Sequence, residues 1–228
     1  MSFQNRSRSF LAADLVLLCC VLMYFVDAHL QPAYPVKSAL KVLCFALLPF
    51  LYARFLAGMR LGQLFRLRKG SGFWRAAALG VGVYFALLAA AWLFHADIDY
   101  TAISQSLSAG QGITRENILW VYLYISFFNS FLEEFFFRGF AYLCLRPIAG
   151  DVFPAFFSAA CFSLYHLSML RGWFPPYLYL LVLFALFLGG LLFCRLDRDS
   201  GTLYNSWIVH MFLNFGINTV GLLFLFAS

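Results

Sequence analysis

The stretch FLEEFFFRGF, residues 131–140, sets two adjacent carboxylates and an arginine among phenylalanine rings. Glu133 and Glu134 could act as general bases, because a carboxylate held away from bulk water can take a proton from a bound water molecule. Glu134 and Arg138 are four residues apart, so on a helix they share a face and can pair. Arg138 is also within reach of Glu133, and the spacing leaves open which glutamate it pairs with.

Two histidines and an asparagine farther along the chain add further polar groups. His166 lies four residues after Phe162 in FSLYH, and Asn214 lies four residues after His210. On helices these residues form polar stripes, which must face one another or a wet cavity because lipid cannot satisfy them. Hydrogen bonds between membrane helices, worth about 0.6 kcal/mol each, account for isolated asparagines but not for two neighbouring carboxylates. An ionisable group inside a membrane costs about 3 kcal/mol or more, so this set indicates a functional site.

The composition indicates the solvent that surrounds these residues. Of the 228 residues, 63% are hydrophobic and 11% charged, whereas a soluble domain is typically about half apolar and about a quarter charged. We therefore predict an all-α, polytopic transmembrane bundle. Spans of about 20 apolar residues occur seven times, at residues 10–30, 39–58, 72–95, 118–140, 152–170, 176–195 and 203–226. With no internal repeat or long linker, we predict one transmembrane domain, residues 1–228, whose catalytic core is residues 118–226.

The lysines and arginines predict the orientation of the chain. With a cytoplasmic N-terminus, twelve of the 16 basic residues fall on the inner side, or eleven when Arg138 is counted inside the membrane, as the positive-inside rule favours. The remaining four, expected on the outer side, are Lys37, Lys41, Arg115 and Arg171. The net charge of +6 then reflects basic loops at a lipid surface, so we expect the lipid bilayer and not nucleic acid as a partner. The short chain favours a multi-pass protein of the bacterial inner (plasma) membrane.

Three motifs, in order along the chain, resemble those of the CPBP family. This family comprises type II CAAX prenyl endopeptidases and bacteriocin-processing or self-immunity membrane proteins, also called Abi. The motifs here are Glu133-Glu134-x-x-x-Arg138, Phe162-x-x-x-His166 and His210-x-x-x-Asn214. The resemblance implies a glutamic-type intramembrane endopeptidase that hydrolyses a peptide bond of a membrane-associated protein or peptide precursor.

The resemblance also implies a role for each matching residue. Glu134, the second glutamate of the pair, would act with His166 to activate a water molecule for attack on a peptide carbonyl. His210 and Asn214 would hold the oxyanion. The remaining motif residues would complete the site, with Glu133 in the catalytic group and Arg138 and Phe162 in support.

The same residues permit other interpretations. Glu134, His166 and His210 make a plausible three-ligand zinc site, although the sequence has no HExxH motif and each ligand comes from a different predicted span. We therefore expect chemistry without a metal or other cofactor. A CPBP-like scaffold or immunity protein would keep the polar core without proteolysis and would tolerate the loss of Glu134. A proton-coupled carrier would also use buried ionisable groups, but the short chain without a repeat disfavours it.

Overall fold

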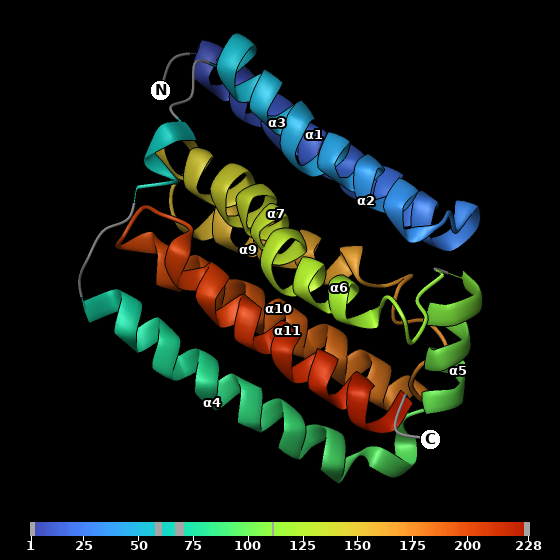
Figure 1. Cartoon of the computed structure of the whole chain (residues 1–228). Coiled ribbons are helices and arrows are strands. Elements are labelled where there is room, and N and C mark those ends of the chain that lie inside the picture. The colour runs from blue at the N-terminus through green and yellow to red at the C-terminus, as the bar shows by residue number, and fades with distance from the viewer. Residues whose placement is uncertain (1–2, 58–60, 67–70, 111, 226–228) are drawn as a thin grey trace.

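The computed structural model describes residues 3–57, 61–66, 71–110 and 112–225, and within these ranges the regular structure is helical, without strands. The predicted all-α class is confirmed. The helices run alongside one another in a bundle, and the start of α1 and the end of α11 lie at opposite ends of it (Figure 1). Opposite ends are what an odd number of membrane crossings requires.

A helical hairpin forms one side of the bundle (Figure 1). Its first arm is α1 (Phe3–Phe25) with a wider π-type turn, η1 (Val26–Leu30). Gln31, in the left-handed region at φ 41°, ends this arm and donates its backbone N–H to the Val26 carbonyl. The second arm runs through α2 (Tyr34–Val42), η2 (Leu43–Leu47), α3 (Leu48–Leu51) and η3 (Tyr52–Ala57), and a short turn, η4 (Leu61–Gln63), follows. This hairpin is called the N-terminal hairpin below.

On the opposite side of the bundle lies α4 (Ser71–Leu93), which packs along α11 (Figure 1). Three short helical segments follow it: η5 (His95–Asp97), α5 (Tyr100–Gln105) and η6 (Ser106–Gly110). They connect α4 to the central helices.

The central helices lie between the N-terminal hairpin and α4 (Figure 1). One continuous helix, here called the long helix, joins α6 (Ile118–Leu123), η7 (Tyr124–Asn129), α7 (Ser130–Glu134) and η8 (Phe135–Cys144). The remaining central elements are α8 (Arg146–Ala149), α9 (Val152–Tyr165), α10 (Pro176–Arg198) and α11 (Tyr204–Leu225). The long helix includes two stretches of π-type turns, a geometry that is frequent near functional sites.

Each of the seven predicted spans contains helix, although two of their end residues, 58 and 226, lie outside the described ranges. Within those ranges, five helices are long and apolar enough to cross a membrane: Phe10–Leu30, Tyr34–Leu56, Gly72–Leu93, Pro176–Arg198 and Tyr204–Leu223. The fourth predicted span falls on the long helix, which carries three buried charged residues. The fifth predicted span is too long, because α9 ends at Tyr165 and turns follow it.

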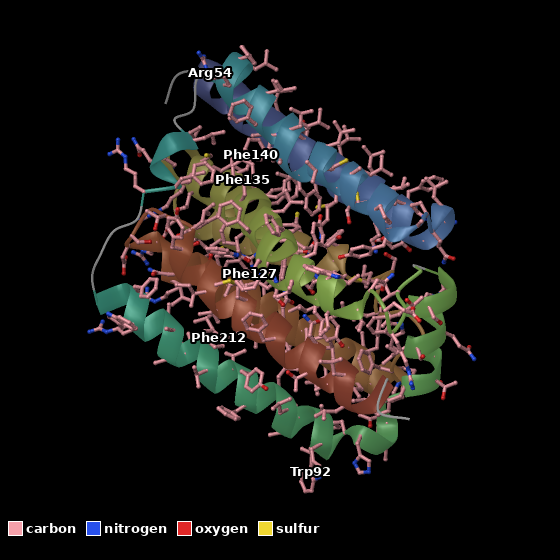
Figure 2. All side chains as sticks on the ribbon, in the orientation of Figure 1. Arg54, Trp92, Phe127, Phe135, Phe140 and Phe212 are labelled. Carbon is pink, nitrogen blue, oxygen red and sulfur yellow. The ribbon has the colours of Figure 1, made fainter. Side chains whose placement is uncertain are left out.

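Aromatic rings join the N-terminal hairpin to the long helix. Phe45 of η2 stacks on Phe136 with ring centroids 4.1 Å apart, and Tyr52 meets Phe140 edge-on at 5.9 Å. Phe140 lies between the hairpin and the rest of the bundle (Figure 2), and Phe135 of the same helix stacks on Phe65 with ring centroids 5.8 Å apart. The buried rings of Phe45 and Tyr52 fix the hairpin against the helix that carries the two glutamates.

Candidate active site

Four polar contacts hold one face of α11 against the long helix. Their α11 members are Trp207, His210, Asn214 and Asn218, which recur every three or four residues and so share a face. The contacts are Trp207 Nε1 to Ser130 Oγ at 3.1 Å, His210 Nδ1 to Glu134 Oε1 at 2.7 Å, Asn214 Nδ2 to the Ile125 carbonyl at 3.2 Å, and Asn218 Nδ2 to Ser126 Oγ at 3.0 Å. These four contacts align the polar residues of α11 with those of the long helix.

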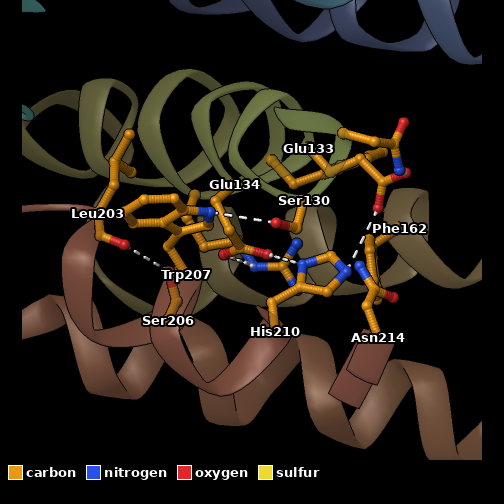
Figure 3. A network of polar contacts seen from close by, with 12 residues as sticks. Ser130, Glu133, Glu134, Phe162, Leu203, Ser206, Trp207, His210 and Asn214 are labelled. Atoms are coloured by element: carbon orange, nitrogen blue, oxygen red, sulfur yellow. Dashed lines mark hydrogen bonds and ion pairs between the residues drawn. The ribbon is translucent and has the colours of Figure 1, made fainter. Parts of the chain in front are cut away.

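His210 lies between the two glutamates (Figure 3). Its Nδ1 donates to Glu134 Oε1, since an ionised carboxylate only accepts, and its Nε2 lies 3.7 Å from Glu133 Oε2. All three side chains are buried, with Glu134 fully enclosed. A histidine between two carboxylates in a low-dielectric core is suited to holding and moving protons.

Arg138 pairs with Glu134, which answers the question that the spacing left open. Its Nε lies 3.3 Å from Glu134 Oε2, and both side chains are completely buried. The guanidinium lies between two rings, 4.2 Å from the centroid of Phe162 and 4.8 Å from that of Phe193, where cation–π attraction adds to the ion pair. Both oxygens of Glu134 thus face a positioned partner.

Glu133 has a different environment. Its Oε1 accepts from Asn129 Nδ2 at 3.0 Å and forms an ion pair with Lys41 of α2, a buried lysine. Its Oε2 faces His210 Nε2 across the 3.7 Å gap, which is too long for a direct hydrogen bond. Glu133 therefore has one held oxygen and one directed at the histidine.

His166 is the C-cap residue of α9 and is buried next to these groups. Its Nδ1 donates to the Phe162 carbonyl at 2.7 Å, so the neutral ring has Nε2 as an acceptor. His166 lies near Glu133 and His210. The Phe162 ring packs edge-on against both histidine rings, at 4.9 Å from His166 and 5.9 Å from His210, and forms a wall of the site.

A comparison with known protein families matches the same part of the chain. Residues 115–216 match a family model described as type II CAAX prenyl endopeptidase Rce1-like. The range contains all three motifs and every contact of the glutamate–histidine cluster except the one from Lys41. This segment is similar to the Rce1-like family. The match confirms the predicted resemblance to the CPBP family, and an endopeptidase family is a family of hydrolases. Searches of curated proteins and of solved structures found no match.

A buried aspartate positions the start of the last Rce1-like helix. Asp197, near the end of α10, accepts from the backbone N–H of Ser206 at 3.0 Å and from its Oγ at 2.6 Å. These bonds satisfy donors in the first turn of α11, one turn before His210. No motif marks Asp197 in the sequence, although a carboxylate just before a Ser-Gly turn and a new helix is typical of a cap.

Lys41 is a site residue that the sequence analysis missed. The positive-inside count gives it a side of the membrane and no partner, and the structure places it within the span Tyr34–Leu56 with only 5% of its surface exposed. The physical reason is the charge balance of the core, where two carboxylates and one arginine leave a negative charge that needs a partner. That imbalance, with a lysine inside an apolar stretch, is the signal that could have found it.

The zinc interpretation has limited geometric support. Within the described ranges, no group of three or more His, Cys, Asp or Glu side chains is arranged as metal ligands. Glu134 contacts His210, whereas the hydrogen bond of His166 runs to its own helix. Chemistry without a metal remains a prediction.

Proposed function

We propose that this chain is an intramembrane endopeptidase that hydrolyses a peptide bond of a membrane-associated protein or peptide precursor. The observation that carries the proposal is the placement of His210 between two buried carboxylates within the Rce1-like segment. Buried charges are costly, and this cluster combines a base, donors for developing charge and walls that exclude bulk water.

The geometry favours Glu133 as the water-activating base, in place of the Glu134 that the family resemblance implies. Glu134 already accepts from His210 and faces Arg138, so it is suited to orienting the histidine. Glu133 Oε2 and His210 Nε2, 3.7 Å apart, can both reach one water molecule at hydrogen-bond distance. His166 Nε2 offers a further acceptor for that water.

The proposed reaction is a hydrolysis in two proton transfers. Glu133 takes a proton from water while the water oxygen bonds to the carbonyl carbon of the substrate. Asn214 Nδ2 and His210, when protonated at Nε2, donate to the oxyanion, and each such donor typically contributes about 3 kcal/mol. The C–N bond then breaks, and the amine nitrogen takes the proton from Glu133.

The test compares the peptide termini of membrane and secreted proteins in the host, with wild-type protein or Glu133→Gln at equal levels. We expect uncut precursors to accumulate in the variant, because loss of a general base typically slows a reaction about 100- to 10,000-fold. Glu134→Gln keeps an acceptor for His210 and should retain part of the activity. The matched control is Glu116→Gln, an exposed glutamate outside the cluster.

Each outcome of this comparison has a defined meaning. Precursors that accumulate with Glu133→Gln but not with Glu116→Gln support the protease and identify its substrate. Identical termini in all strains contradict it and favour the scaffold or immunity protein. If Glu134→Gln abolishes cleavage and Glu133→Gln does not change it, Glu134 is the base.

A further inference from the structure

The strongest feature outside the Rce1-like segment is the buried lysine of the N-terminal hairpin. Lys41 Nζ donates to Asn129 Oδ1 at 2.7 Å and forms its ion pair with Glu133 Oε1. It also lies over two aromatic rings, 5.1 Å from the centroid of Tyr165 and 5.6 Å from that of Phe45. Lys41 therefore joins three parts of the fold: α2, the long helix and the end of α9.

A second lysine on the same helix shows that this arrangement is specific. Lys37, one turn earlier, pairs with Asp27 at 2.6 Å, and both residues belong to the hairpin. That ion pair ties the two arms of the hairpin together. Lys41, in contrast, directs its charge out of the hairpin at a residue of the site.

The contacts of Glu133 indicate what Lys41 does there. A carboxylate can rotate about its last bond, and both Lys41 and Asn129 hold the same oxygen, Oε1. Because these two contacts hold Oε1, the other oxygen, Oε2, faces His210 Nε2. Catalytic groups must be held close to their productive geometry, and displacements of about 1 Å can cost about 100-fold in rate.

We propose that Lys41 is a positioning residue of the active site, which orients the Glu133 carboxylate toward the catalytic water from outside the family segment. The inference rests on the proposed function, with Glu133 as the base. It means that the N-terminal hairpin supplies part of the catalytic arrangement and is more than an anchor in the bilayer.

The test measures how fast new peptide termini form in the host after synthesis of the protein is induced. We expect Lys41→Met to slow their formation about 100-fold, and Lys41→Arg, which keeps the charge and the donors, to recover most of the rate. Lys37→Met is the matched control, because it removes the same side chain and an ion pair one turn away; it should cleave at the wild-type rate. Blots and thermal unfolding confirm equal amounts of folded protein.

Glu133→Gln, measured in parallel, separates this inference from the proposed function. If wild type and Glu133→Gln give the same termini, Glu133 is not the base and the premise of this inference fails; if Glu134→Gln also gives the wild-type termini, the proposed function fails. If they differ and Lys41→Met cleaves at the wild-type rate, only the role of Lys41 is overturned. If Lys41→Met does not fold, Lys41→Gln decides, since it keeps a hydrogen-bond donor without the charge: slow cleavage supports the role and wild-type cleavage overturns it.

Discussion

At the scale of the residue, the two glutamates differ in what surrounds them. Glu134 is enclosed by His210 and Arg138, whereas Glu133 is held at one oxygen by Lys41 and Asn129. Adjacent positions on a helix point about 100° apart, so neighbouring carboxylates meet different partners. This division supports one glutamate as the orienting group and the other as the base.

Arg138 provides a test of the orienting group. Arg138→Met leaves Glu134 buried without its counter-charge, so we expect the free energy of unfolding to fall by about 3–5 kcal/mol. Denaturant unfolding in detergent measures the change. Arg195→Met, an exposed arginine of α10, is the matched control and should unfold like wild type. Adding Glu134→Gln to Arg138→Met should recover part of the loss; equal stability of Arg138→Met and wild type would contradict the ion pair.

Much of the site could be predicted at this scale, for a physical reason. Ionisable groups inside a membrane must find partners, and the four-residue spacing of Glu134 and Arg138 indicates one such pair. Lys41 escapes prediction because a count of basic residues by side gives each lysine a side of the membrane but no partner. Its partner, Glu133, is 92 residues away in the chain, and no local spacing reveals such a pair.

At the scale of the element, close approach between helices fixes where His166 lies. Gly190 of α10 packs against Ala159 of α9 so tightly that a Cβ there would lie 2.9 Å from the Ala159 Cα. Small residues allow membrane helices to approach in this way. α9 is thereby held with its end, and His166, next to α11.

Gly190 and its neighbour give a matched pair of variants. Gly190→Ala should lower the free energy of unfolding by about 1–3 kcal/mol, because the clash is with backbone that cannot rotate away. Gly189→Ala meets nothing within 4 Å and should be neutral or slightly stabilising. Thermal unfolding of the two variants checks the difference. Equal stability would contradict the close packing of α9 on α10.

Hydropathy predicts where helices occur better than where they end. The helix in the predicted span 152–170 ends at Tyr165, since the His166 ring bonds back to the Phe162 carbonyl and the backbone leaves the helix. The residues that follow are still apolar, so hydropathy extends the predicted membrane span over them. A hydropathy window averages over such side-chain bonds and cannot detect them.

At the scale of the whole molecule, the site combines the Rce1-like segment with the N-terminal hairpin. The predicted orientation, with a cytoplasmic N-terminus, places Glu116 outside and Asp199 inside. In a cysteine-free background, an impermeant maleimide applied to intact cells or right-side-out vesicles should label Glu116→Cys and should label Asp199→Cys only after permeabilisation. The reverse pattern would overturn the predicted orientation. Labelling of both cysteines on the same side would overturn the odd number of crossings predicted between residues 116 and 199.

The most direct test of proteolysis with Glu133 as the base uses purified protein in liposomes with the precursor that accumulates in the host. We predict that wild-type protein forms the new terminus and that Glu133→Gln does not, while both unfold at the same temperature. Cleavage by folded Glu133→Gln at the wild-type rate would contradict Glu133 as the base. Failure of the folded wild-type protein to cleave that precursor would contradict the protease itself.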